Sequence, residues 1–468
     1  MPSNFANRIS RRAFVTASSA FALTTALGPR AFAQTLPRAA DVVVIGAGAA
    51  GIAAARRVIA AKRSVIVVEA DSRIGGRCQT DTTTLDAVFD RGARFLHNPE
   101  TNALIKLARA AGVEIYPAPP GQKLRIGRRN ARSGEAETLL AALVRANRAI
   151  SDAARRGDIA SSAVLPKDLG VWADTIRFIL GPYTTAKDLT ELSTLDQSRA
   201  VERLSEISCR SGIGGLMQTL AQGLPVALGT KADRVNWRGR ELSVETPQGK
   251  IATRAIIVTV STNVLASGAI RFTPDLPKRT LDAAARLTLG SCDHIALELE
   301  GNPLGLGRDE MLIEQSRDIR TGVLLANIGG SSLCTVDVAG AFGRDLAAQG
   351  EAAMVAFATE WLTKLYGDDV ARAVKRTATT NWNAAPCVRG AMSAAAPGGG
   401  GARKILAEPQ GNLFFAGEAT HDTLWGSVDG AWESGESAAD AALKALGPVA
   451  AAPVAASSKK SRKRKSAE

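Results

Sequence analysis

The chemistry open to this sequence is indicated first by Gly46, Gly48 and Gly51, which have the spacing G-x-G-x-x-G. The first glycine permits a tight turn, the second lets the backbone approach a pyrophosphate, and the third lets a helix pack closely on a strand. Glu69 follows about 20 residues later, where a carboxylate can accept hydrogen bonds from both hydroxyls of a ribose. These residues together predict a dinucleotide-binding site.

A strand, a helix and a second strand must position these residues. Residues 42–45 form a β-branched run typical of a strand buried on both faces, and residues 65–68 form another. The alanine-rich stretch 49–61 between them predicts a helix whose positive N-terminal end faces the phosphates. Because the parts occur in this order, a dinucleotide site is favoured over a chance run of glycines.

A second turn, Arg73-Ile74-Gly75-Gly76-Arg77, indicates which dinucleotide is bound. Its glycines bring the backbone to the cofactor again, and its two arginines supply charge for the phosphates. The turn resembles the R-x-G-G-R element of flavin amine oxidases and their relatives, which an NAD-dependent dehydrogenase does not need. The resemblance therefore favours FAD.

Two further segments resemble the same family. Residues 89–97 (FDRGARFLH) resemble the segment that leads under the isoalloxazine. Residues 412–420 (NLFFAGEAT) read as a strand and a turn that place Glu418 to bond a ribityl or ribose hydroxyl, and a helix then opens near Ser427, its N-terminus aimed at the flavin. The resemblance implies that FAD contacts Gly46, Gly48, Ala49, Ala50, Gly51, Glu69, Ala70, Arg73, Gly75, Gly76, Arg77, Gly92, Ala93, Arg94, Phe95, Val235, Gly417, Glu418, Ser427 and Val428.

The chain is identified as a member of the flavin-containing amine oxidase family over nearly all of residues 40–446. The resemblance implies an α/β fold: a Rossmann-type FAD-binding domain of glutathione-reductase-like topology with an interleaved α+β substrate domain. It also implies hydride transfer to flavin N5 from the carbon next to an amine nitrogen, an imine that hydrolyses, and oxygen or another electron acceptor. The expected FAD-binding domain comprises residues 40–98, 212–272 and 398–446, and the substrate or cap domain comprises residues 99–211 and 273–397.

The residue opposite flavin N5 departs from the family. Residues 289–297 match the segment that normally carries a lysine bonded through water to N5, and His294 occupies the matching position. An imidazole could hold that water, and its near-neutral pKa suits proton transfer. The alternative is a strand histidine with a structural hydrogen bond.

The aromatic cage around the amine also departs from the family. Residues 382–397 resemble the segment that crosses the flavin face, and Ala391 stands where monoamine oxidases carry the cysteine of covalent FAD, so non-covalent FAD is expected. Met392 and Ser427 replace the two cage tyrosines. These losses weaken a claim for small monoamines, and no paired acids of the cap support a polyamine. Trp425, Trp382 and Phe95 are candidates to replace the missing cage walls, and the alternative is that they are core residues.

Two other functions stay open at this stage. A flavin desaturase or oxidase of the carotenoid or porphyrinogen type shares the same motifs at its ends. A non-catalytic flavoprotein partner subunit would explain the lost cage and the missing lysine. Nucleic-acid binding is disfavoured because most of the net charge of +13 lies at the two ends of the chain. A homodimer stays open.

Both ends differ from the body of the sequence. Residues 1–33 contain Ser10-Arg11-Arg12, an apolar run and Ala31-Phe32-Ala33, which predict a twin-arginine signal peptide and a periplasmic or secreted protein exported in its folded state. Residues 447–468 predict a disordered basic tail that could contact membrane headgroups.

The middle of the chain is less informative. Five dispersed cysteines argue against a disulfide framework, and three histidines argue against a metal centre. Hydrophobic spacing predicts helices over 101–111, 138–155, 169–180, 201–207 and 344–366, and strands over 293–300, 311–314 and 323–328.

Overall fold

The computed structural model describes residues 36–203 and 205–448. The predicted signal peptide and basic tail therefore lie outside the described residues, apart from the first two residues of the tail. All of the helices and strands lie in the unit that begins at Pro37.

The first sheet contains the two strands predicted around the glycine turn. Its order is β10-β2-β1-β13-β12-β11-β14, and β20 also pairs with β13. Strands β2, β1, β13 and β20 run parallel, and their buried valines and isoleucines explain why they read as continuous apolar runs. The bounds are β1 (Ala39–Ile45), β2 (Val65–Val68), β10 (Val226–Ala227), β11 (Arg234–Asn236), β12 (Leu242–Thr246), β13 (Gly249–Val258), β14 (Arg271–Thr273) and β20 (Leu413–Phe415).

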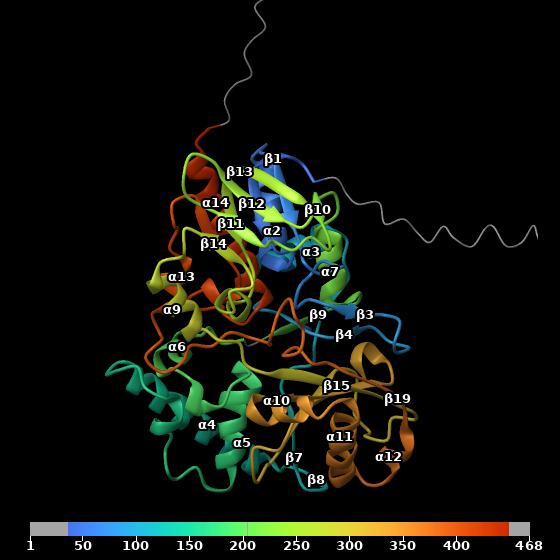
Figure 1. The fold of residues 1–468 in the computed structure, drawn as a ribbon. Helices are drawn as coiled ribbons and strands as arrows, with labels where there is room; N and C mark the ends of the chain where they lie inside the picture. The colour runs from blue at the N-terminus through green and yellow to red at the C-terminus, as the bar shows by residue number, and fades with distance from the viewer. Residues whose placement is uncertain (1–35, 204, 449–468) are drawn as a thin grey trace, which may run out of the picture. The chain divides into compact units, whose positions relative to one another are not determined.

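Two helices pack on this sheet and on each other. Helix α2 (Ala49–Ala60) and helix α14 (Val428–Leu446) lie beside β1 and β13 (Figure 1). A Cβ placed on Gly435 would lie 2.1 Å from the carbonyl oxygen of Ala50, so only glycine allows the two helices to cross this closely. The first and last helices of the described residues, α2 and α14, are thereby joined beside the glycine turn.

The second sheet has the order β19-β15-β18-β17-β16-β7-β8. Helices α10 (Gly340–Ala348) and α11 (Glu351–Tyr366) cover it and form an apolar core with β15 and β18. The neighbouring strands β15, β18, β17 and β16 are antiparallel to one another. The strand bounds are β7 (Lys123–Ile126), β8 (Arg129–Asn130), β15 (Cys292–Leu299), β16 (Glu310–Glu314), β17 (Val323–Ala326), β18 (Leu333–Ala339) and β19 (Val374–Thr379).

The remaining elements connect and cover the sheets. Helix α4 (Ser133–Ala154) buries one face with helix α5 (Ala173–Phe178), and helix α6 (Thr194–Arg199) packs beside α4. The others are β3 (Thr80–Asp81), β4 (Phe89–Asp90), β5 (Leu96–His97), α3 (Ala103–Ala110), β6 (Ile115–Pro117), β9 (Glu206–Cys209), α7 (Gly212–Leu220), α8 (Thr262–Ala266), α9 (Lys278–Arg286), α12 (Asp369–Ala373) and α13 (Ala402–Ala407), with short helical turns between them.

Two of the predicted helices are wrong. The stretch 344–366 is divided into α10 and α11 because Gly350 adopts φ +93°, a left-handed conformation that a helix cannot continue through. The stretch 201–207 is not a helix: from Glu206 it is strand β9, which pairs with β5 and β6. Tertiary pairing outweighs the local apolar spacing there.

The predicted domain ranges distribute between the two sheets. The first sheet's strands come from residues 40–98, 212–272 and 398–446, except for Ala39, which begins β1, and Thr273, which ends β14. The second sheet's strands come from residues 99–211 and 273–397. The domain boundaries themselves stay a prediction.

Candidate active site

One cavity of about 940 Å³ collects most of the predicted site residues. This volume lies at the upper end of the range for ligand pockets. Three predicted residues, Gly51, Arg73 and Val235, do not line it. Those that do are Gly46, Gly48, Ala49, Ala50, Glu69, Ala70, Gly75, Gly76, Arg77, Gly92, Ala93, Arg94, Phe95, His294, Trp382, Met392, Gly417, Glu418, Trp425, Ser427 and Val428.

The glycines of the first turn differ in what surrounds them. Gly46 adopts φ +105°, and a Cβ there would meet the Thr259 hydroxyl at 2.5 Å. A Cβ on Gly51 would lie 1.9 Å from the Gly46 carbonyl oxygen, so Gly51 serves helix packing and stays away from the cavity. Gly48 has open space: only the Gly75 carbonyl oxygen comes within 4 Å, at 3.9 Å. The glycine part of the cavity, defined by Gly46, Gly48, Gly75 and Gly76, thus exposes backbone to a ligand.

Glu69 ends β2 beside this turn. One carboxylate oxygen accepts a hydrogen bond from the Ala47 amide at 2.6 Å, and the other accepts one from the Asp71 amide at 2.8 Å. Each oxygen keeps a second lone pair for a ligand hydroxyl. Burial raises the pKa of Glu69, while these two amides lower it. The geometry suits the predicted ribose contact.

The two arginines of the second turn, predicted to supply charge for the phosphates, already have partners within the protein. Arg73 lies outside the cavity lining and pairs with Asp71 at 3.4 Å. Arg77 lines the cavity, but its Nη1 pairs with Glu418 at 2.8 Å and donates to the Ala391 carbonyl at 2.5 Å. Carboxylates within reach take up both charges. The start of α2, whose first turn has no acidic residue, is left as the anion-binding feature.

Val235, the predicted adenine contact, does not line the cavity. Val235 is fully buried in β11, between Val244 of β12 and Phe272 of β14. The residues of this segment that line the cavity are Thr230, Lys231 and Ala232, which precede β11. The sequence prediction chose the strand, whereas the loop before it reaches the cavity.

Glu418 was predicted to bond a flavin hydroxyl, and the structure gives its carboxylate four protein partners. One oxygen accepts from Arg77 and from the Ser393 amide at 3.2 Å. The other accepts from the Ser393 hydroxyl at 2.6 Å and the Gly426 amide at 2.8 Å. A carboxylate offers about four lone-pair sites, so these contacts fill them. Glu418 therefore links three segments of the cavity wall.

Aromatic side chains from distant segments line the rest of the cavity. Phe95 and Tyr183 contact one apolar cluster, and Trp382 packs beside Gly92 with its indole nitrogen donating to the Arg91 carbonyl at 2.8 Å. Trp425 is 2% exposed, and its indole nitrogen has no hydrogen-bond partner among the described residues. We define the aromatic part of the cavity by Phe95, Tyr183, Trp382 and Trp425.

The residues at the two cage positions do not form aromatic walls. Ser427 is the N-cap of α14: its hydroxyl accepts from the Gly430 amide at 3.0 Å and donates to the Leu424 carbonyl at 2.6 Å. Met392 lines the cavity, and its sulfur would lie 3.2 Å from a Cβ on Gly426. Ser427 thus positions a helix, and Met392 fills space beside the turn that precedes it.

His294 lies in β15 with both ring nitrogens occupied. Nδ1 lies 2.7 Å from an Asp337 carboxylate oxygen, and Nε2 lies 3.0 Å from the Gly92 carbonyl oxygen. Both partners are acceptors, so a ring protonated on both nitrogens satisfies both contacts. Neither nitrogen is left to hold a water, which favours the structural alternative for His294 over the catalytic one.

Asp337 contacts two basic side chains in the cavity wall. It bonds His294 and pairs with Arg94, whose other Nη donates to the Thr335 hydroxyl at 2.5 Å. Burial alone would raise the pKa of Asp337, but Arg94 and His294 lower it to about 2. The three groups fix the segment Gly92–Phe95 that was predicted to run under the flavin.

Several cavity residues were not predicted. Tyr183 ends the helical turn Ile179–Tyr183, and Glu202, Arg203 and Glu206 follow α6. Arg203 donates to the Trp425 carbonyl at 2.6 Å, whereas the Glu206 carboxylate has no ion pair among the described residues. Burial raises the pKa of Glu206. A tyrosine directly after Pro182 and the two glutamates that follow α6 were the available signals.

Comparison with known proteins identifies the family. The flavin-containing amine oxidoreductase family matches residues 49–443. The chain belongs to this family. Curated relatives include the protein FLOWERING LOCUS D of Arabidopsis thaliana, 25% identical over 84% of this chain and 54% of that protein, and Polyamine oxidase 4 of Oryza sativa subsp. japonica, 25% identical over 87% and 89%. The chain thus spans about half the length of FLOWERING LOCUS D.

Solved structures of amine oxidoreductases share the fold. Putrescine oxidase bound to putrescine has a TM-score of 0.74 at 19% identity, covering 86% of this chain and 98% of that one. Cyclohexylamine oxidase from Brevibacterium oxydans has a TM-score of 0.74 at 21% identity, covering 87% and 99%. The family match confirms the predicted family and its FAD cofactor, and the solved structures confirm the predicted fold class.

The cavity of this family member fits FAD. The open space beside Gly48 and the free lone pairs of Glu69 suit a pyrophosphate and a ribose, and the same cavity continues to the aromatic residues. Ala391 lines it without a nucleophile. Burial raises the pKa of the Cys387 thiol, and the nearby charges of Glu69 and Asp71 raise it further. These positions suit non-covalent FAD.

In residues 36–203 and 205–448, no cluster of three or more His, Cys, Asp or Glu side chains could hold a metal ion. No helix in the same ranges combines the length and the apolar character that crossing a bilayer requires.

Proposed function

We propose that the protein oxidises an amine at the carbon next to its nitrogen, with oxygen or another acceptor taking the electrons. One observation carries the proposal: a single cavity joins the glycine part, which suits a dinucleotide, to the aromatic part, which suits an organic substrate. FAD, when bound, supplies the acceptor for the hydride.

The residues of the chain have three tasks in this proposal. Glu69 and the start of α2 hold the ribose and the phosphates. Phe95, Tyr183 and Trp425 exclude water and confine the amine in its neutral form, which hydride transfer requires. The Arg94–Asp337–His294 group fixes the segment between Gly92 and Phe95. No side chain is required to act as a nucleophile.

Glu206 supports a substrate that carries a second, protonated amino group. Its carboxylate lines the cavity, lacks an ion pair among the described residues and is partly buried, so it can pair with a ligand cation. This contact replaces the paired cap acids that the sequence did not reveal. The polyamine and putrescine oxidases among the similar proteins also support a diamine or polyamine.

The experiment that tests the function is anaerobic reduction of the holoenzyme by a panel of amines. The panel contains primary and secondary monoamines, diamines, polyamines and amino acids, with apolar polyenes and a porphyrinogen as controls. We expect at least one amine to bleach the flavin, and a diamine to do so at a lower concentration than its monoamine analogue. Bleaching by a polyene or porphyrinogen alone would support the desaturase alternative, and reduction by dithionite alone would support the non-catalytic one.

We also propose export by the twin-arginine route, which the Arg11-Arg12 pair supports. In a bacterial host the wild-type chain should reach the periplasm, and the double variant Arg11→Lys, Arg12→Lys should stay in the cytoplasm. Equal periplasmic amounts of both would contradict the proposal.

A further inference from the structure

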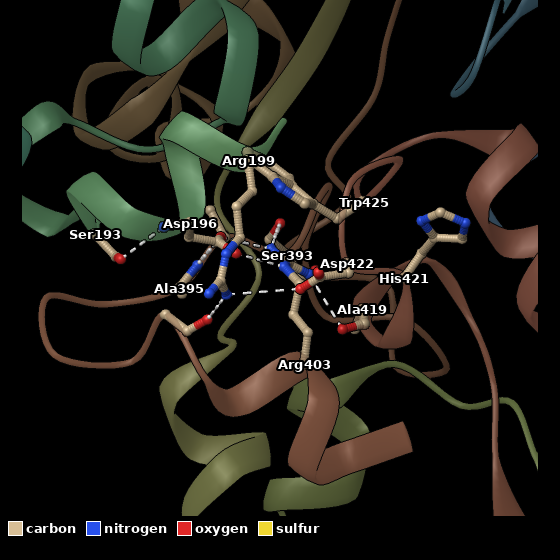
Figure 2. Close-up of polar contacts among 12 residues, drawn as sticks. Ser193, Asp196, Arg199, Ser393, Ala395, Arg403, Ala419, His421, Asp422 and Trp425 are labelled. Atoms are coloured by element: carbon tan, nitrogen blue, oxygen red, sulfur yellow. Dashed lines mark hydrogen bonds and ion pairs between the residues drawn. The ribbon is translucent and has the colours of Figure 1, made fainter. Parts of the chain in front are cut away.

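A buried ion pair connects the cap to the C-terminal half of the chain. Arg403 of α13 is 1% exposed, and Asp196 of α6 is 3% exposed. Arg403 Nε donates to one Asp196 oxygen at 2.7 Å, and Nη2 donates to the other at 2.8 Å (Figure 2). Asp196 also accepts from the Ala395 amide at 2.9 Å. This bidentate geometry fixes the plane of the guanidinium.

The remaining N–H groups of Arg403 reach the segment around Ser393. Nη1 donates to the Ser393 hydroxyl at 2.9 Å and the Ala419 carbonyl at 3.2 Å, and Nη2 donates to the Ser393 carbonyl at 3.2 Å. A guanidinium has five N–H donors, and all five are therefore used. Lysine, with a single nitrogen, cannot reproduce this arrangement.

The network continues from Ser393 to the cavity wall. Ser393 donates to Glu418 through its hydroxyl and its amide, and Glu418 pairs with Arg77. Negative and positive groups thus alternate from Asp196 through Arg403 and Glu418 to Arg77. Burial alone would raise the pKa of Glu418, but the charges of Arg77 and Arg403 lower it, so it remains a carboxylate.

Trp425 is a further cavity residue that this network contacts. The guanidinium carbon of Arg403 lies 4.7 Å from the centre of the Trp425 ring. The indole nitrogen of Trp425 has no hydrogen-bond partner among the described residues, so packing and the Arg403 contact hold the ring. Figure 2 shows Trp425 beside the network of Arg403, Ser393 and Asp196.

We propose that Arg403, oriented by Asp196, is a positioning residue that fixes Trp425 and Glu418 as walls of the substrate cavity. The assignment of these walls to a substrate cavity rests on the proposed function. Arg403, Asp196 and Ser393 do not line the cavity, whereas Trp425 and Glu418 do, so the pair acts through them. Because Asp196 belongs to the predicted cap, the cap sets the position of a wall built from the C-terminal segment.

The test compares Arg403→Lys and Asp196→Asn with Arg63→Gln as a matched control. Arg63 is a buried arginine that pairs with Asp41 at 3.4 Å and donates to the Gly447 carbonyl, away from the cavity. Each holoenzyme is compared by thermal unfolding, FAD affinity, kcat and KM for the best amine, and acrylamide quenching of tryptophan fluorescence. Adding Trp425→Phe to each background isolates the signal of Trp425.

We expect Arg403→Lys and Asp196→Asn to expose Trp425 to acrylamide. Both should also raise KM by about tenfold, because a small displacement of the walls places the substrate less well for reaction. Arg403→Lys keeps the charge, so its unfolding temperature should fall less than that of Asp196→Asn. Arg63→Gln should lower the unfolding temperature and leave both Trp425 quenching and KM unchanged.

The proposal is overturned if Arg403→Lys and Asp196→Asn lower stability as Arg63→Gln does, with unchanged Trp425 quenching, FAD affinity and KM. The ion pair would then be purely structural. Quenching and FAD affinity do not require turnover. If no amine reduces the wild-type flavin, the proposed function fails while the positioning role is still decided by these two measurements.

Discussion

The glycine part and the aromatic part of the cavity are built in opposite ways. The glycine part uses backbone from two adjacent turns, supported by β1, β2 and α2, and its main side-chain contribution is Glu69. The aromatic part uses side chains from four distant segments, which carry Phe95, Tyr183, Trp382 and Trp425. A site made of backbone depends on glycine spacing, whereas a site made of side chains depends on how remote segments meet.

Because of this difference, the two parts are affected by different kinds of substitution. In the glycine part, a substitution acts by adding volume next to a carbonyl oxygen or the ligand. In the aromatic part, it also acts through buried charged groups: Arg94–Asp337–His294 lies in the cavity wall, and Arg403–Asp196 lies behind it. Variants in each part therefore test whether the glycine part and the aromatic part can be altered independently of each other.

The largest effect is expected in the wall of the aromatic part, for Asp337→Asn. The change leaves Arg94 and His294 without their buried counter-charge, and removing one partner of a buried pair costs about 3–5 kcal/mol. Urea unfolding at neutral pH measures this loss. A loss below about 1 kcal/mol would show that the pair does not stabilise the wall.

The pH dependence of the same variant sharpens the test. The pKa of Asp337 is lowered to about 2 in the folded protein, so its contribution is present above its unfolded pKa and is lost as the pH falls through about 2. This shift corresponds to roughly 2 kcal/mol. The difference in unfolding free energy between wild type and Asp337→Asn should shrink between about pH 4 and pH 2.

The next largest effect separates two glycines of one turn. Gly51→Ala should destabilise the fold by about 1–3 kcal/mol, since its Cβ would meet the Gly46 carbonyl oxygen at 1.9 Å. Gly48→Ala should leave the apo-protein stable and weaken FAD binding, because its Cβ enters the open space of the cavity. Thermal unfolding without FAD and titration with FAD measure both. Equal destabilisation of both apo-proteins would contradict the assigned roles.

A smaller effect is expected for Glu206→Gln in the aromatic part. Loss of the carboxylate should raise KM for a diamine by about tenfold, near 1.4 kcal/mol, the size of a charge-assisted contact. KM for a monoamine of the same length is the control and should stay within about twofold. Parallel increases for both substrates would mean that Glu206 does not bind a second amino group.

The smallest effect is expected for the Tyr183 hydroxyl. Its contact is the sulfur of Met311 at 4.0 Å, which is a weak partner. Tyr183→Phe should therefore leave KM within about twofold, while Tyr183→Ala should raise it by more because the ring is lost. If Tyr183→Phe raised KM as much as Tyr183→Ala, the hydroxyl would be a substrate ligand.

The contrast between the two parts also explains what the sequence could predict. Gly46, Gly48, Gly51 and Glu69 lie within one βαβ unit, and local spacing determines their places. The roles of the arginines depended on partners that the motif does not contain, so Arg77 was assigned to phosphates although Glu418, far along the chain, pairs with it. Val235 was assigned from the resemblance to the family, and it lies in β11, whereas the residues of this segment that line the cavity precede the strand.

The aromatic part was harder to predict because its members share no segment. Tyr183 ends a helical turn in the predicted cap, and Glu206 begins β9, at the end of a stretch predicted to be a helix. Neither position follows from periodicity, since pairing of β9 with β5 and β6 decides it. His294 was placed correctly in a strand on the cavity wall, but its acceptors, Asp337 and the Gly92 carbonyl, come from other segments.

The absorption spectrum of the protein after purification without added flavin tests the central claim most directly. We predict a flavin band whose chromophore is released as FAD by denaturation, since Ala391 offers no covalent anchor, and which is absent from a folded Gly48→Ile variant. A colourless wild-type protein that cannot take up FAD would contradict the account, as would an unchanged flavin content in Gly48→Ile.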